Sequence, residues 1–309
     1  AEQARFSPAD RPVKPPHPVT SFVQFLFRMF SVLPLALLHA LGWGLGWLSF
    51  LGSGRYRRRL LAHARLAGVA RGTVLASVGE AGKLVAELPR LWLGRPVAVD
   101  WDGADCIGAA QAQGRGVLFL TPHLGCFEIT AQAYAQRFGA RQPMTVLFRP
   151  ARQPWLRDLV ADSRQRPGLR TAPTTLAGVK QLIKALKAGE VVGLLPDQVP
   201  PDGQGVWAPF FGRDAYTMTL SARLAHAANA QVLLAWGERL SWGRGYRVHV
   251  RRYDEATWGV LSSDAATAAR QINQAMESLV RECPRQYLWS YDRYKSPATH
   301  RAPGDASTA

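Results

Sequence analysis

The segment "GVLFLTPHLGCFEITAQAYAQRF", residues 116–138, decides the architecture that we expect for this chain. Its first part, "GVLFLT", is a continuous apolar run with the length of a strand buried on both faces. Its last part, "FEITAQAYAQRF", is typical of a helix. His123 falls in the loop between them, and Glu128 follows in the first helical turn. The segment therefore predicts a strand–loop–helix unit of an α/β fold, with polar side chains where the strand ends.

Strands and helices alternate on both sides of this segment. We predict strands over residues 94–101, 116–121, 144–148, 191–196, 231–240 and 246–253, the last two as an antiparallel pair. We predict helices over residues 60–93, 104–113, 127–138, 152–165, 176–190, 217–229 and 264–282. A Gly- and Pro-rich loop is expected over 194–217. This order predicts a mixed, mostly parallel sheet flanked by helices.

An apolar segment precedes the predicted sheet. Met29 to Leu51 runs 23 residues without Lys, Arg, Asp or Glu, and about 20 apolar residues suffice to cross a bilayer core. "RYRRR", Arg55 to Arg59, follows at once, and the positive-inside rule places that end in the cytoplasm. Pro34 and the glycines of the segment allow a second interpretation, two shorter helices lying in the interface. Either way, we expect an N-terminal membrane-anchoring helix.

These features divide the chain into four parts. We expect an irregular tail over 1–20, a membrane anchor over 21–54, one α/β domain over 55–297 and a disordered tail over 298–309. The 38 Lys and Arg exceed the 22 Asp and Glu, for a net charge of +16, which favours an anionic partner. We expect no nucleic-acid binding, because the sequence has no basic stripe with stacking aromatics and no known motif. The three scattered cysteines indicate neither a disulfide scaffold nor a metal site.

His123 and Glu128 are candidates for acid–base chemistry. Five positions apart, they do not share a helix face, but a loop residue and a first-turn residue can converge. A carboxylate on one imidazole nitrogen fixes the tautomer, and the other nitrogen then accepts a proton from a hydroxyl. Two alternatives remain: Glu is favoured in a first helical turn by the helix dipole alone, and Cys126 could pair with His123 as a nucleophile.

Three further stretches follow this one along the chain, and the order of the four is informative. "LFRPARQP" carries Arg149, the loop over 194–217 carries "LPDQ" and "PFFGRDAYT", and "QYLWSYDRYK" closes the domain. Together with "HLGCFE", they resemble the blocks of the late acyltransferases of lipid A biosynthesis, the lauroyl/myristoyl transferases of the lysophospholipid acyltransferase superfamily. The resemblance covers about residues 20–297. One departure is Tyr291-Asp292-Arg293-Tyr294, where the family usually has His-Arg-Arg-Phe.

The resemblance implies an O-acyltransferase that moves a fatty acyl chain from an acyl carrier protein thioester to a 3-hydroxyacyl hydroxyl of a lipid A precursor. His123 would deprotonate the hydroxyl, and Glu128 would orient the imidazole. The oxyanion would be stabilised by backbone N–H groups near Gly125, by Arg149 or by Arg164. Candidate substrate-binding residues are Arg149, Arg164, Arg166, Asp197, Gln198, Arg213 and Arg293.

The same resemblance implies the partners and the location. The partners would be acyl carrier protein, which is acidic, an anionic glycolipid acceptor and the membrane. No cofactor or metal is expected. The enzyme would lie at the bacterial inner membrane with its catalytic domain on the cytoplasmic side. An acyltransferase of the same fold that acts on a lysophospholipid or another glycolipid remains the alternative.

Overall fold

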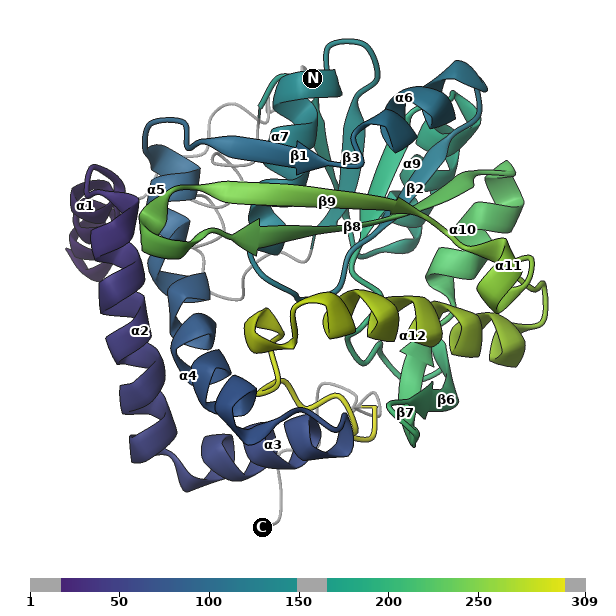
Figure 1. The fold of residues 1–309 in the computed structure, drawn as a ribbon. Helices are drawn as coiled ribbons and strands as arrows, with labels where there is room; N and C mark the ends of the chain where they lie inside the picture. The colour runs from purple at the N-terminus through teal and green to yellow at the C-terminus, as the bar shows by residue number, and fades with distance from the viewer. Residues whose placement is uncertain (1–17, 149–165, 298–309) are drawn as a thin grey trace, which may run out of the picture.

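The centre of the protein is a seven-stranded sheet. The computed structural model describes residues 18–148 and 166–297. The strand order is β1-β9-β8-β2-β5-β3-β4 (Figure 1). Their bounds are β1 (Val99–Asp102), β2 (Val117–Leu120), β3 (Met144–Phe148), β4 (Leu169–Pro173), β5 (Val191–Leu194), β8 (Gln231–Arg239) and β9 (Tyr246–Arg252). Strands β8, β2, β5, β3 and β4 are parallel, whereas β9 runs antiparallel to β8 and parallel to β1. The predicted mixed, mostly parallel sheet is confirmed.

Helices cover both faces of this sheet. Along β2, Leu118 and Leu120 point into one hydrophobic core, and Val117 and Phe119 into another. This alternation explains why the strand is apolar at every position. Helices α9 (Leu176–Lys187), α10 (Leu220–Ala228) and α12 (Ala265–Glu282) contribute to the first core. Helices α6 (Asp105–Ala112) and α7 (Phe127–Phe138) contribute to the second.

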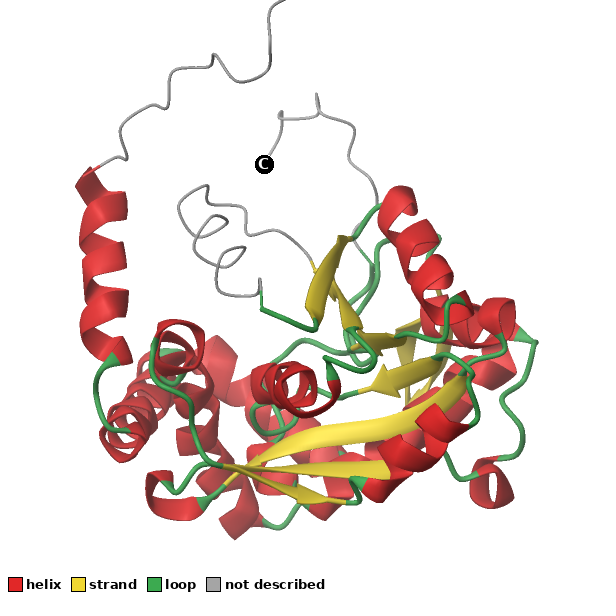
Figure 2. Ribbon diagram, turned by 90° about the horizontal axis from the view of Figure 1, so that it is seen from above, coloured by secondary structure: helices red, strands yellow, loops and turns green. Residues whose placement is uncertain are grey.

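The N-terminal apolar segment forms two helices rather than one. The bounds are α1 (Pro18–Ser31), α2 (Leu35–Gly52), α3 (Gly54–Leu66), α4 (Arg71–Ala86) and α5 (Leu88–Leu93). Pro34 separates α1 from α2, because proline lacks an N–H group and restricts the residue before it. Among the described helices, only α2 is long and apolar enough to cross a membrane. Figure 2 shows the N-terminal end of α1 projecting from the body of the protein.

Helix α2 lies along α4 (Figure 1), and glycines set their separation. A Cβ atom on Gly46 would overlap the carbonyl oxygen of Val78, and one on Gly82 would overlap that of Gly42. The sides of α2 that face away from α4 expose large apolar side chains, namely Leu37, Leu41, Leu45, Leu48 and Leu51. One face of α2 therefore packs on the domain while the other is apolar and uncovered, as a candidate membrane anchor requires.

Several elements differ from the sequence-based expectation. The expected loop over 194–217 contains a hairpin of β6 (Gly205–Phe210) and β7 (Arg213–Met218), so α10 begins three residues later than predicted. The hairpin turns at Phe211 and Gly212, which both have positive φ, and a phenylalanine there is not a recognised turn signal. Strand β4 was not predicted. The single helix expected over 60–93 is instead divided among α3, α4 and α5. The short remaining elements are α11 (Glu255–Trp258), η2 (Ser241–Gly243) and η3 (Pro284–Gln286). The helix expected over 152–165 lies outside the described residues.

Candidate active site

His123 and Asp197 lie side by side at the carboxyl edge of the sheet. Strands β2 and β5 are parallel neighbours in which Leu120 pairs with Leu194. His123 comes three residues after Leu120, and Asp197 comes three residues after Leu194. The two loops therefore leave the sheet from the same level and in the same direction. This edge is where α/β sheets usually place their ligands.

The Asp197 carboxylate holds the His123 imidazole in one orientation. Its Oδ1 lies 2.7 Å from His123 Nδ1, and its Oδ2 accepts the backbone N–H of His123 at 2.8 Å. The hydroxyl of Tyr287 donates to Oδ2 at 3.3 Å. Burial opposes ionisation of Asp197, but its interactions with His123 and the nearby charge of Arg293 outweigh burial and lower the pKa of the carboxyl. An ionised Asp197 requires a proton on Nδ1, so neutral His123 has its lone pair on Nε2.

The amide of Gln198 faces that lone pair. Gln198 Nε2 lies 2.8 Å from His123 Nε2, and a neutral imidazole with Nδ1 protonated accepts this bond. The His123 side chain is 13% exposed. A hydroxyl that took the place of the Gln198 amide would bond to the basic nitrogen of an imidazole already oriented by a carboxylate.

Both ring nitrogens of His123 have partners other than Glu128. Glu128 is in the first turn of α7, as expected, and its side chain is buried. The indole N–H of Trp92 in α5 donates to its Oε2 at 3.4 Å. The carboxylate on the ring of His123 is Asp197 rather than Glu128, because adjacent parallel strands bring their loops together. Proximity in the sequence does not bring Glu128 to the ring.

The loop between β2 and α7, residues 121–126, is the candidate catalytic loop, and backbone hydrogen bonds fix it to two other segments. The Gly125 N–H donates to Gln286 O at 2.9 Å, and the Cys126 N–H donates to Gly237 O at 2.8 Å. The Leu288 N–H donates to His123 O at 3.1 Å. The closing "QYLW" element therefore supports the loop directly. It also follows that the N–H groups at and next to Gly125 already have partners and do not form the oxyanion site that we considered.

A buried ion pair, Arg239 and Glu87, also holds the same loop in place. Arg239 in β8 and Glu87, at the junction of α4 and α5, form two hydrogen bonds of 2.8 Å each. A third bond joins Arg239 Nη2 to Gly125 O at 2.7 Å. Burial would raise the pKa of Glu87, but Arg239 and His39 lower it to about 2. Glu87 also binds His39 of α2 at 3.2 Å, so the candidate membrane helix and the candidate catalytic loop share one polar network.

Sequence reasoning missed this network. Glu87 and Arg239 belong to no recognisable motif, and each stands in a segment that otherwise contributes to the core. The one available signal was their charge, because a carboxylate or guanidinium in an apolar segment is rarely buried without a partner.

The alternative Cys–His nucleophile is wrong. The Cys126 side chain is fully buried. Burial and the nearby charge of Glu87 raise the pKa of the thiol well above its usual value. A thiol without thiolate character is a poor nucleophile. Within the described ranges, no three His, Cys, Asp or Glu side chains are arranged to hold a metal ion.

The other predicted substrate-binding residues are dispersed. Arg293 is 2% exposed and donates to Tyr216 O and Thr217 Oγ1, at 2.7 Å each. It stabilises the β6–β7 hairpin from inside the core. The guanidinium of Arg213 stacks on Tyr294, 4.9 Å from the ring centre. Arg166 donates to Leu91 O at 2.6 Å, and Arg149 and Arg164 lie outside the described residues.

Comparisons with known proteins identify the family of the chain. A model of the family described as bacterial lipid A biosynthesis acyltransferase matches residues 75–296. The lipid A biosynthesis lauroyltransferase of Escherichia coli (strain K12) is 30% identical over 63% of this chain and 61% of its own length. The palmitoleoyltransferase of the same organism is 28% identical over 64% and 61%, and the myristoyltransferase is 26% identical over 67% and 61%. The chain thus spans about three fifths of the length of these relatives. It belongs to the bacterial lipid A biosynthesis acyltransferase family.

Proposed function

We propose that this protein transfers a fatty acyl chain from an acyl carrier protein thioester to a 3-hydroxyacyl hydroxyl of a lipid A precursor. The observation that carries the proposal is the orientation of His123. Asp197 binds its Nδ1, and its Nε2 faces a side-chain amide that a hydroxyl can replace. Such a histidine is suited to deprotonate an alcohol. Family membership supports acyl transfer as the use of that base.

The reaction needs no acyl-enzyme intermediate. The acceptor hydroxyl displaces the Gln198 amide and donates its proton to His123 Nε2 as its oxygen attacks the thioester carbonyl. Asp197 stabilises the imidazolium that forms. The tetrahedral intermediate then collapses, the C–S bond breaks, and the departing thiolate takes the proton from Nε2. The products are an ester and a free thiol, and His123 returns to its neutral form.

The charge of the tetrahedral intermediate requires fixed donors. Arg149 and Arg164 remain our proposal for these donors, since the N–H groups around Gly125 are engaged elsewhere. The released amide of Gln198 is positioned to hold the acceptor oxygen. Glu128 lies in the first turn of the helix that follows the catalytic loop. We propose that it adds negative charge beside the imidazolium and positions Trp92.

The net charge of +16 supports two anionic partners, the acidic acyl carrier protein and the glycolipid acceptor. The apolar outer face of α2 supports attachment to the bacterial inner membrane. Arg55 to Arg59 directly follow this helix, which supports a catalytic domain on the cytoplasmic side. The names of the three relatives specify different acyl chains, lauroyl, palmitoleoyl and myristoyl, so the donor chain is left to experiment.

Mass spectrometry tests this function. The purified protein is incubated with a lipid A precursor that carries free 3-hydroxyacyl groups and with a panel of acyl carrier protein thioesters. We expect the precursor to gain the mass of one acyl chain. The variant His123→Gln should remain folded and transfer none. A gain of mass with lysophospholipids, and none with the lipid A precursor, would support the alternative acceptor class. Full activity of His123→Gln would refute the mechanism.

A further inference from the structure

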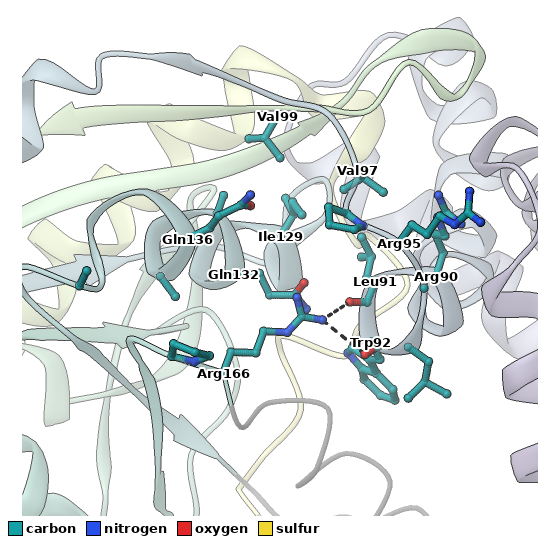
Figure 3. A pocket seen from close by; sticks show the side chains of 17 residues that line it. Arg90, Leu91, Trp92, Arg95, Val97, Val99, Ile129, Gln132, Gln136 and Arg166 are labelled. Carbon is teal, nitrogen blue, oxygen red and sulfur yellow. Dashed lines mark hydrogen bonds between the residues drawn. The ribbon is translucent and has the colours of Figure 1, made fainter.

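A large cavity opens between α5 and the outer side of α7, next to the catalytic loop but separate from His123. Its volume is about 710 Å³, which lies within the range of about 300–1,000 Å³ typical of ligand sites. Trp92 lines it and donates to Glu128, so its inner end adjoins the first turn of α7. Figure 3 shows α5 and α7 on two sides of this space, with the Arg166 guanidinium bonded to the backbone oxygens of Leu91 and Trp92 in α5.

The charged residues that line this cavity are all cationic. They are Arg90, Arg95 and Arg166, and no Asp or Glu is among the described lining residues. Arg90 and Arg95 form no ion pair within residues 18–148 and 166–297. The other walls are largely apolar and include Leu91, Trp92, Val97, Val99 and Ile129. The cavity therefore combines cationic side chains with apolar walls.

Two buried donors in the cavity lack acceptors. Gln132 lies one helical turn beyond Glu128 in α7, and its side chain is 8% exposed. Its Nε2 has no hydrogen-bond partner among the described residues, and neither has the buried Nε of Arg90. A buried donor without a partner is costly, and native proteins rarely retain one without a reason. Both unsatisfied atoms are donors, so what completes the site must supply acceptors.

We infer that this cavity binds an organic phosphate ester carried by one of the two substrates. A phosphate monoester offers three strong acceptor oxygens and up to two negative charges, and a phosphodiester offers two such oxygens and one charge. This matches guanidinium groups together with a neutral N–H donor better than a carboxylate does. The volume exceeds that of a phosphate alone, and the apolar walls accommodate the body of the molecule that bears it. The phosphate is that of the glycolipid acceptor or that of the phosphodiester arm of the acyl donor. The assignment to a substrate rests on the function proposed above.

Binding can be tested without acyl transfer. Glucosamine 1-phosphate is titrated with the purified full chain in detergent and followed by ³¹P NMR. We expect saturable binding, and a dissociation constant at least about tenfold larger in Gln132→Leu and in Arg90→Gln, because each removes a donor to a charged group. Gln204→Leu and Arg223→Gln change exposed residues elsewhere, on the hairpin segment and on α10, and should bind as the wild type does. Absence of binding, or equal binding by all variants, would overturn the inference.

Kinetics then distinguish the source of the phosphate. The Michaelis constant is measured for the intact acceptor, for the acceptor after phosphatase treatment, and for the donor. If the acceptor phosphate binds here, Gln132→Leu raises KM about tenfold for the intact acceptor and leaves it unchanged for the treated one. If the donor arm binds here, the donor KM rises with both acceptors. No change in any KM would overturn the assignment to a substrate. Failure of the wild type to transfer acyl chains would refute the proposed function while leaving the binding result intact.

Discussion

Replacing Asp197 by asparagine should disable His123 while preserving the shape of the site. Asp197 accepts the His123 backbone N–H at Oδ2 and the ring Nδ1–H at Oδ1. An asparagine can keep only one of these bonds, because one of its two polar atoms is a donor. The backbone N–H cannot turn away, so the amide oxygen stays with it and the NH₂ group faces Nδ1. Nδ1 must then accept, which moves the ring proton to Nε2 and removes the lone pair that the hydroxyl needs.

The expected loss follows from the charge that is removed. Asp197 Oδ1 lies 2.7 Å from Nδ1, which puts the centres of the two charges about 4 Å apart. At an effective dielectric constant of about 20, such a pair attracts by about 4 kcal/mol. That stabilisation of the imidazolium is worth about a thousandfold in rate. We therefore expect kcat for acyl transfer to fall by about three orders of magnitude in Asp197→Asn, with the tautomer change adding to the loss.

Initial rates measured by mass spectrometry, together with the far-ultraviolet circular dichroism spectrum and thermal unfolding, provide the test. Asp202→Asn makes the same chemical change at an exposed position in the same loop and should leave kcat unchanged. A folded Asp197→Asn protein with kcat within about threefold of the wild type would refute the role of Asp197, because general-base catalysis contributes at least about a hundredfold.

Three further predictions concern stability and the loop. The pKa of Glu87 is lowered from 4.5 to about 2, so its stabilisation is complete above pH 4.5 and is lost as the pH falls towards 2. Urea unfolding should show a loss of about 3 kcal/mol across that window, and a free energy that is constant there would contradict it. Gly46→Ala in α2 would overlap the Val78 carbonyl oxygen and should lower the unfolding temperature by several degrees. Gly44→Ala, with open space around it, should not lower it, since alanine favours the helix by about 1 kcal/mol; equal temperatures for the two variants would refute the packing argument. Gly125 has positive φ, and a Cβ there would overlap the Gly237 carbonyl oxygen. Gly125→Ala should therefore abolish acyl transfer, whereas Gly108→Ala in α6 should retain it. An active Gly125→Ala would show that the loop tolerates displacement.

Local patterns were sufficient for much of the fold. The apolar runs at β2, β3 and β5 and the helical spacing of α7, α9 and α12 appeared at nearly the observed bounds, because each is set by residues a few positions apart. Pro34 likewise indicated a possible helix break in the apolar segment. The β6–β7 hairpin escaped notice because its turn depends on a phenylalanine with positive φ, which only the packing of the hairpin against α12 enforces.

The candidate site, like the fold, was predicted in part from local sequence and decided in part by tertiary structure. The sequence by itself determined that His123 would stand in a loop at a strand end, and the order of the motifs indicated the family. It did not determine which carboxylate would reach the imidazole, because that depends on which strands are neighbours. Pairing of β2 with β5 brings Asp197 to His123 across 74 residues of sequence, whereas Glu128, five residues away, faces Trp92. The buried pair of Glu87 and Arg239 and the cavity beside α7 were likewise decided only by tertiary structure, since each is assembled from segments that meet only when the chain has folded.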